Sequence, residues 1–199
     1  MKRNPGAILA IFLALFCLTA WAAADAPRTL VEEGINEVLA VVTQQGLQAY
    51  VRQARLRDLI GKRFDFDTMA RSILARNWKK ATPEQQSRFV ELFRQLLENT
   101  YITTIESYSD EKFHYGKERV DGNKATVPVT VTLKTGTDAP LLFKLRNSQG
   151  AWAVYDVVIE GVSLISTYRS SFGTIVSKDG VDGLLQQLEE KVNKEPESA

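Results

Sequence analysis

Residues 152–176 constrain the fold more than any other stretch of the sequence. Their first part, 152–160, is dense in Val, Ile, Trp and Tyr, and apolar side chains occupy both odd and even positions. Successive residues of a strand point to opposite faces of a sheet, so this pattern predicts a central strand without a fully wet face. Gly161 ends the pattern, and the apolar residues then recur at helical spacing, at Val162, Ile165, Tyr168, Phe172 and Ile175. The stretch therefore predicts a central strand followed by a helix that can fold back over the sheet.

The N-terminal residues 1–24 have the features of a cleavable secretory signal peptide. Two basic residues follow Met1, an apolar run covers 7–20, and small residues at 22–24 suit cleavage after residue 24. The apolar run is too short for a membrane span, which needs about 20 apolar residues. A lipoprotein signal at Cys17 is the alternative, but a bulky residue precedes this cysteine. Cleavage removes Cys17, so the mature chain has no cysteine and forms no disulfide.

The mature chain is nearly neutral. Loss of Lys2 and Arg3 takes the formal net charge from +1 to −1, which argues against general nucleic-acid binding. The length from 25 to 192 fits a single domain with a sizeable core. Residues 193–199 are polar and contain a proline, so they are expected to form a flexible tail.

Four helices are predicted before the strands. They are 25–45, 47–60, a helix that begins with Asp67 as its N-cap, and a long helix that ends near Ser107. The long helix has the clearest start, because Thr82 can cap it and Gln85 completes a capping box.

Strand patterns follow these helices. Residues 112–120 and 124–134 are joined by Asp121-Gly122, a strong hairpin signal, and Pro128 favours an edge or a bulge in the second strand. A third strand at 141–146 leads to 152–160, and two helices separated by Gly180 complete the chain. This order predicts an α+β fold, in which about six helices cover one face of a twisted four-stranded antiparallel sheet.

Few residues offer catalytic chemistry. His114 is the only histidine, so a catalytic triad and a multi-histidine metal site are excluded, and it fits an ordinary strand position. Asp156 and Glu160 share a strand parity and could do acid–base work, but the pattern favours Asp156 as a hydrogen-bond acceptor for a neighbouring strand or helix end. Basic residues cluster at 52–63 and 71–80, where they form solvated helix faces, a docking surface or contacts to an anionic head group.

The remaining signal is an excess of apolar residues. The strand 152–160 is apolar on both faces, and bulky side chains recur on the inner surfaces of the predicted helices. Sequence alone does not separate a filled core from an apolar pocket, because both need the same residue types.

Two motifs resemble a known family. They are FDFDTMARSILARNWKKATPEQQSRFVELFRQLLENTY at 64–101 and WAVYDVVIEGVSLISTYRSSFGTIVSKDGVDGLLQQLEEK at 152–191. In order and content they resemble the periplasmic phospholipid-binding proteins of the Mla (maintenance of lipid asymmetry) pathway, also called the toluene-tolerance Ttg2D family. The resemblance covers nearly the whole mature chain, and the second motif is the more specific.

The resemblance implies a periplasmic phospholipid carrier of Gram-negative bacteria with an NTF2-like α+β fold and an apolar cavity between sheet and helices. It implies shuttling between an outer-membrane lipoprotein–porin complex and an inner-membrane ABC transporter with MCE-domain subunits. It implies no catalysis and no cofactor beyond the phospholipid cargo, and we expect a monomer.

Resemblance and strand parity together give a predicted lipid-binding lining. It consists of Phe66, Met69, Ile73, Phe93, Tyr101, Val129, Val131, Phe143, Leu145, Val157, Ile159, Val162, Ile165 and Tyr168.

Two alternatives remain open. An NTF2-like isomerase or hydratase would use Asp156 as a base whose pKa is raised by an apolar pocket. A structural adaptor would have a solid core and no ligand.

Overall fold

The computed structural model describes residues 26–108 and 110–194. The predicted signal peptide, 1–24, lies outside the described residues, as does 195–199 of the predicted tail. In chain order the elements are α1 (Pro27–Val42), α2 (Ala49–Arg63), α3 (Phe66–Leu74), the 3₁₀ helix η1 (Ala75–Lys80), α4 (Pro83–Ser107), β1 (Lys112–Tyr115), β2 (Arg119–Asp121), β3 (Lys124–Thr132), β4 (Asp138–Ser148), β5 (Ala151–Ile159), β6 (Val162–Ser163) and α5 (Leu164–Asn193). The predicted α+β order is therefore confirmed.

The helix starts show where local sequence decides the structure. At α4, Thr82 Oγ1 accepts from Gln85 N at 3.2 Å and Gln85 Oε1 accepts from Thr82 N at 2.9 Å, so the predicted capping box is confirmed. At α3 the predicted cap was wrong, because Asp65 rather than Asp67 accepts from Thr68 N, at 2.8 Å.

The sheet has six strands rather than the predicted four. It is antiparallel in the order β1-β3-β4-β5-β6, and β2 also pairs with β3. The predicted strand 112–120 is interrupted at Gly116, where it gives β1 and β2, and the two-residue β6 adds a further strand. Pro128 lies opposite this interruption, where Gly116 N donates to its carbonyl at 2.8 Å. A proline fits there because no regular ladder needs its missing N–H.

The predicted central position of 152–160 was wrong. Its strand, β5, pairs with the long β4 on one side, but on the other side only with β6 and with Phe64, which forms a parallel bridge to Val154. The centre of the sheet is formed by β3 and β4 instead. The apolar pattern on both faces of β5 arises because α3 and α5 also pack against this strand.

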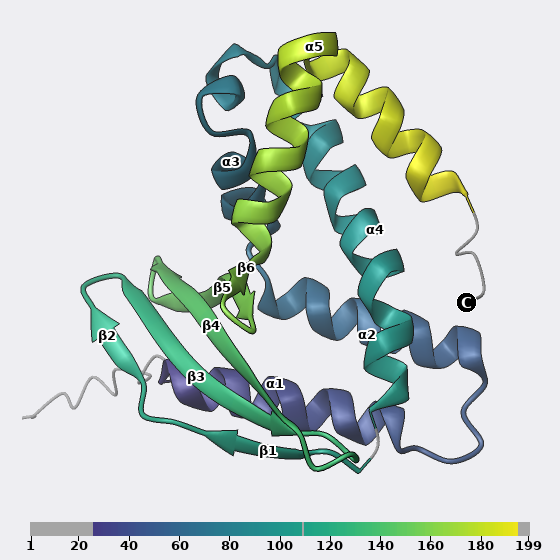
Figure 1. Ribbon diagram of the computed structural model, residues 1–199, viewed down its shortest axis with the longest axis vertical. Helices are drawn as coiled ribbons and strands as arrows, with labels where there is room; N and C mark the ends of the chain where they lie inside the picture. Colours follow the sequence, from purple (N-terminus) through teal and green to yellow (C-terminus); the bar gives the residue numbers. More distant parts are fainter. Residues whose placement is uncertain (1–25, 109, 195–199) are drawn as a thin grey trace, which may run out of the picture.

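Helix α5 changes direction at the predicted break. Gly180 has φ 73° and ψ −176°, a conformation that glycine adopts without a steric penalty. The second half of α5 then runs beside α4, where Arg88 pairs with Glu189 at 2.9 Å and Asn99 Nδ2 donates to the carbonyl of Val192. Figure 1 shows both halves of α5 meeting at the top of the molecule.

The helices and the sheet form two hydrophobic clusters. Helices α3, α4 and α5 stand together in the upper part of Figure 1 and share one cluster, whereas β3, β4, β5 and α1 share the other. Phe64, between α2 and α3, packs against both clusters. No helix within the described residues is long and apolar enough to cross a membrane.

Candidate functional site

One face of the sheet is apolar over three strands. Across β3, β4 and β5 its residues align in three rows, which are Val129–Leu141–Ile159, Val127–Phe143–Val157 and Ala125–Leu145–Val154. On β1 the same face continues through Phe113 and Tyr115, which lie beside Val131 and Val129. The alternation of β3, apolar then polar, places its threonines on the opposite face.

A β-bulge in β5 completes this apolar face. The pairing between β4 and β5 shifts between Lys144 and Leu145, so that Lys144 faces Asp156 while Leu145 faces Val154. The extra residue in β5 is Tyr155, which packs against the helical cluster. Val154 and Val157 therefore share a face although their sequence parity assigns them to opposite faces.

Apolar side chains around this face are only half-buried. We call the following set the apolar lining: Leu30, Ile35, Phe113, Tyr115, Leu141, Phe143, Ile159 and Leu164, all partly buried and packed against the sheet cluster. Helix α1 belongs to the same cluster through Val31, which is 3% exposed. Apolar area left in contact with water costs about 25 cal/mol per Å², so a ligand that covers this lining gains free energy.

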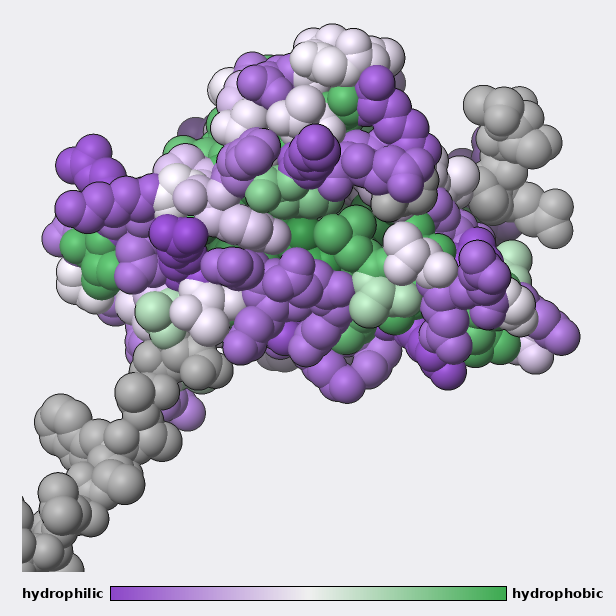
Figure 2. All heavy atoms as spheres, turned by 90° about the horizontal axis from the view of Figure 1, so that it is seen from below, coloured by the Kyte–Doolittle hydropathy of each residue, from purple (hydrophilic) through white to green (hydrophobic). Residues whose placement is uncertain are grey.

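The lower end of the molecule exposes apolar surface. Figure 2 shows an apolar strip across the middle of this end with hydrophilic residues on both sides. The sheet, α1 and α2 form this end of the molecule in Figure 1. An apolar surface with a polar rim is typical of a binding site for an apolar ligand or partner.

The helical cluster, by contrast, is tightly packed around aromatic rings. Phe93 and Tyr168 meet edge to face at 5.3 Å between ring centroids, and Phe89 meets Phe172 in the same manner at 6.0 Å. Phe89, Phe93 and Met69 are each 0% exposed. These contacts join α3, α4 and α5 into one solid layer.

The structure distributes the predicted lining over both clusters. Phe66, Met69, Ile73, Phe93 and Ile165 are buried in the helical cluster, where Tyr101 and Tyr168 are partly buried, while Val129, Leu145 and Val157 are buried in the sheet cluster, where Phe143 and Ile159 are partly buried. Val131 is buried on β3, whereas Val162 is 60% exposed on β6. Val162 lies outside because α5 begins only at Leu164, so the predicted helical stripe did not extend to this residue. The role of these residues toward lipid stays a prediction.

Tyr101 and Tyr168 place two hydroxyl groups among apolar residues. Burial, together with the neighbouring Tyr101 that is hydrogen-bonded to it, raises the pKa of Tyr168 to about 12. A phenol with this pKa stays neutral at physiological pH and donates or accepts hydrogen bonds without carrying charge.

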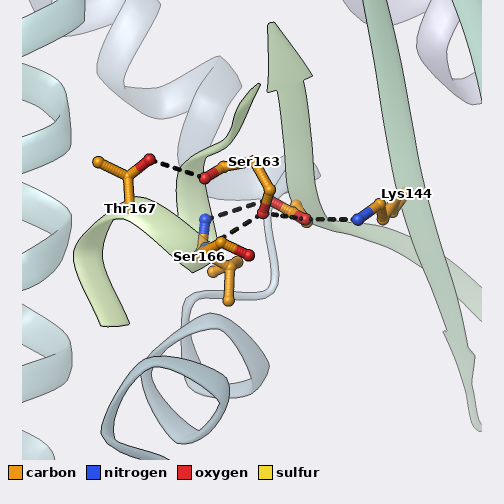
Figure 3. Close-up of polar contacts among 6 residues, drawn as sticks. Lys144, Ser163, Ser166 and Thr167 are labelled. Atoms are coloured by element: carbon orange, nitrogen blue, oxygen red, sulfur yellow. Dashed lines mark hydrogen bonds and ion pairs between the residues drawn. The ribbon is translucent and has the colours of Figure 1, made fainter. Parts of the chain in front are cut away.

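Asp156, the candidate base of the enzyme alternative, accepts hydrogen bonds that connect β4, β6 and the start of α5. Its Oδ2 accepts from Lys144 Nζ at 2.9 Å and from Ser163 Oγ at 2.8 Å, and its Oδ1 accepts from Ile165 N at 3.2 Å (Figure 3). The predicted acceptor role toward a neighbouring strand and a helix end is therefore confirmed. Both oxygens have partners within the protein and Asp156 is 3% exposed, as expected for a carboxylate with a structural role.

Several lining residues were missed by sequence reasoning. Phe113 and Tyr115 flank His114 at strand spacing, and the apolar stripe of α1 includes Ile35, yet both patterns fit an ordinary core. His114 itself is exposed on β1. In the part of the chain that the structure describes, no group of His, Cys, Asp and Glu could hold a metal ion.

The fold and the site together define an α+β protein with a wide apolar surface at one end of its sheet. A solved structure with the same fold is the phospholipid-binding protein from Ralstonia solanacearum in complex with a phospholipid, with a TM-score of 0.76, 30% identity, and coverage of 83% of this chain and 96% of that chain. The "Toluene tolerance protein ttg2D" of Pseudomonas putida is 28% identical over 180 residues, which are 87% of this chain and 83% of that relative.

A further relative is the "Intermembrane phospholipid transport system binding protein MlaC" of Haemophilus influenzae. It is 26% identical over 200 residues, with coverage of 94% of this chain and 92% of the relative. The family model described as "MlaC protein" matches residues 32–190. The chain belongs to the MlaC family, as its two sequence motifs predicted.

Proposed function

We propose that this chain binds phospholipid with its acyl tails against the apolar lining and carries it between the two membranes of a Gram-negative envelope. The observation that carries the proposal is the apolar face of the sheet at the lower end, where the three aligned rows meet the apolar lining, whose side chains are only partly buried. The Ralstonia relative with this fold was solved with a phospholipid, which supports the same class of ligand here.

The physics of transfer favours a carrier of this kind. Each CH₂ contributes about 0.8 kcal/mol on leaving water, so two tails of roughly 15 CH₂ each cost about 24 kcal/mol to expose. An apolar lining replaces the membrane interior with an environment of similar polarity, and the exchange becomes nearly balanced. The carrier then needs no ATP of its own, and its partners set the direction.

The proposal extends to the place of action and the partners. The predicted signal peptide directs the chain to the periplasm, as a monomer that takes no cofactor. The family membership supports partners in an outer-membrane lipoprotein–porin complex and an inner-membrane ABC transporter with MCE-domain subunits.

Native mass spectrometry of protein isolated from a bacterial envelope tests lipid binding. We expect co-purified phospholipid in the native chain and a lower load in Ile159→Trp, because Ile159 belongs to the apolar lining. Ser171→Trp on α5 is the matched control, since Ser171 is exposed and lies outside the apolar lining, and its substitution should leave the load unchanged. A bare native protein, or equal loads in both variants, would contradict the proposed binding surface.

The isomerase or hydratase alternative makes a different prediction. It needs a free carboxylate at Asp156, whereas Lys144, Ser163 and Ile165 occupy both carboxylate oxygens. No observation in the described residues favours this alternative. We therefore propose that the chain is not an enzyme, and that folded Asp156→Asn protein retains its phospholipid load.

A further inference from the structure

A second hollow lies at the opposite end of the molecule from the sheet. It has a volume of about 700 Å³ and lies between η1 and the first half of α5, in the upper part of Figure 1. Its lining consists of Ile73, Leu74, Ala75, Arg76, Asn77, Lys80, Arg169, Ser170, Gly173, Thr174, Val176 and Ser177. This volume is within the range of small-molecule binding sites, about 300–1,000 Å³.

The hollow gathers three cationic side chains, Arg76, Lys80 and Arg169. Among the described residues, no carboxylate forms an ion pair with Arg76, Lys80 or Arg169. Some other arginines are paired: Arg63 reaches two glutamates of α1, and Arg88 reaches Glu91 and Glu189. Cations brought together without partners repel one another, so an anion bound between them would be stabilised.

The remaining groups of the hollow suit an anion with several oxygen atoms. Arg169 Nε donates to the carbonyl of Ser72 at 2.8 Å, which orients the guanidinium and leaves its terminal nitrogens as donors. Ser170, Thr174 and Ser177 follow one another at helical spacing along the α5 wall of the hollow. Thr174 Oγ1 donates to the carbonyl of Ser170 at 3.2 Å, so the hydroxyl donors that the wall offers an anion are those of Ser170 and Ser177. Below these polar groups, Ile73 and Leu74 connect the hollow to the helical cluster.

We propose that this hollow binds a phosphate group, carried by a free phosphate ester or by a lipid head group. Arginine matches phosphate because its planar guanidinium donates two parallel hydrogen bonds, while lysine adds a point charge. The hollow is concave and its lining contains hydroxyl donors as well as cations, so it fits a compact tetrahedral anion better than the flat acidic surface of a protein partner. This site is separate from the apolar lining and does not depend on the proposed acyl-chain binding.

The test uses the full mature protein and a double variant that removes two of the cations. Inorganic phosphate and glycerol 1-phosphate are titrated against the native protein and Arg76→Gln/Lys80→Gln, with binding followed by phosphorus NMR. The matched control is Arg119→Gln/Lys124→Gln, which removes the same charge from exposed positions on β2 and β3. In parallel, phosphatidylcholine vesicles with and without phosphatidylglycerol are floated with each protein, and native mass spectrometry measures the phospholipid load.

We expect saturable binding of both soluble phosphates that is weakened about tenfold or more in the double variant and unchanged in the control. If only vesicles with phosphatidylglycerol separate the double variant from the control, the site takes the phosphate of an anionic lipid head group, because the phosphate of phosphatidylcholine is neutralised by its own choline. The proposal is overturned if the double variant and the control variant behave alike in both assays. The phospholipid load should stay unchanged in the double variant, so this result and the test of the proposed function can fail independently.

Discussion

Lys144 Nζ on β4 lies 2.9 Å from Asp156 Oδ2 on β5, and the same carboxylate accepts from the backbone N–H of Ile165 in the first turn of α5. Asp156 is 3% exposed, and Ser163 Oγ of β6 completes its contacts at 2.8 Å. The N-terminus of a helix carries partial positive charge, which also stabilises a carboxylate at this position. One side chain therefore fixes where α5 leaves the sheet, and with it the relative placement of the sheet and the helical cluster.

Replacement of this carboxylate should destabilise the fold strongly. We expect Asp156→Ala to lower the free energy of unfolding by about 2–4 kcal/mol, because it leaves Lys144 and the N–H of Ile165 without their partner. Asp156→Asn keeps an acceptor for Ile165 and should cost about 1–2 kcal/mol. Urea unfolding measures both values, with the exposed Asp121→Asn as control. Equal stability of Asp156→Ala and the control would show that this contact does not hold α5 in place.

The close approach of Gly116, just after β1, to Pro128 of β3 predicts that a larger residue at Gly116 destabilises the fold. A Cβ atom at Gly116 would lie 2.7 Å from Cγ of Pro128, whose ring has little freedom to move. We therefore expect Gly116→Ala to lower the free energy of unfolding by about 1–2 kcal/mol.

Gly61 in α2 is the matched control, because a Cβ atom there meets no heavy atom within 4 Å. Gly61→Ala should raise stability by about 0.5–1 kcal/mol, since alanine is the better helix former. Thermal unfolding of the two variants checks the opposite signs, and a shift in the same direction would contradict the packing at Gly116.

Local sequence patterns predicted the parts of the fold that depend on neighbouring residues. The capping box of Thr82 and Gln85 lies within four residues and formed as predicted. The start of α3 differs from the prediction, which had Asp67 as the cap. Asp65 N donates to the carbonyl of Val154 at 2.8 Å, and this distant contact selects Asp65 as the cap. A choice between two similar aspartates was therefore made by a strand almost ninety residues away in the chain.

The site was less predictable for a similar reason. The strand parity of β5 depends on the bulge at Tyr155, which exists only against the register of β4. Sequence periodicity contains no signal for a bulge, so Val154 and Val157 seemed to point in opposite directions. The predicted helical position of Val162 was wrong for another reason. Its spacing continues the apolar stripe of α5, but the residue lies in β6 and pairs with Ile159 of β5.

Glu98 makes the stability depend on pH. It lies on α4 and is 6% exposed, and Arg57 and Arg94 lie 3.6 Å away. Burial raises the pKa of Glu98 above its ordinary value of 4.5, although Arg94 and Arg57 partly oppose this shift. As pH rises past the ordinary pKa, the unfolded chain loses this proton before the folded protein does, so the free energy of unfolding falls until the folded group also ionises.

Glu98→Gln should remove this contribution. Between about pH 4 and about pH 7 the variant should gain stability relative to the native protein, as measured by urea unfolding at both pH values. Gln95→Ala on the same helix removes no titratable group and should change stability equally at the two pH values. A constant difference between Glu98→Gln and the native protein would show that burial does not shift this carboxyl group.

Ala75 holds a backbone conformation that suits glycine. It follows α3 with φ 49° and ψ −119°, which places its Cβ in a crowded arrangement that costs a non-glycine residue about 1–3 kcal/mol. Ala75→Gly should relieve this strain and raise the free energy of unfolding by about 1 kcal/mol, after the greater freedom of glycine in the unfolded chain is counted. Ala54→Gly inside α2 is the control, because the helical backbone there favours alanine and the change should cost about 1 kcal/mol. If both substitutions lower the midpoint of thermal unfolding, the turn between α3 and η1 holds no strain.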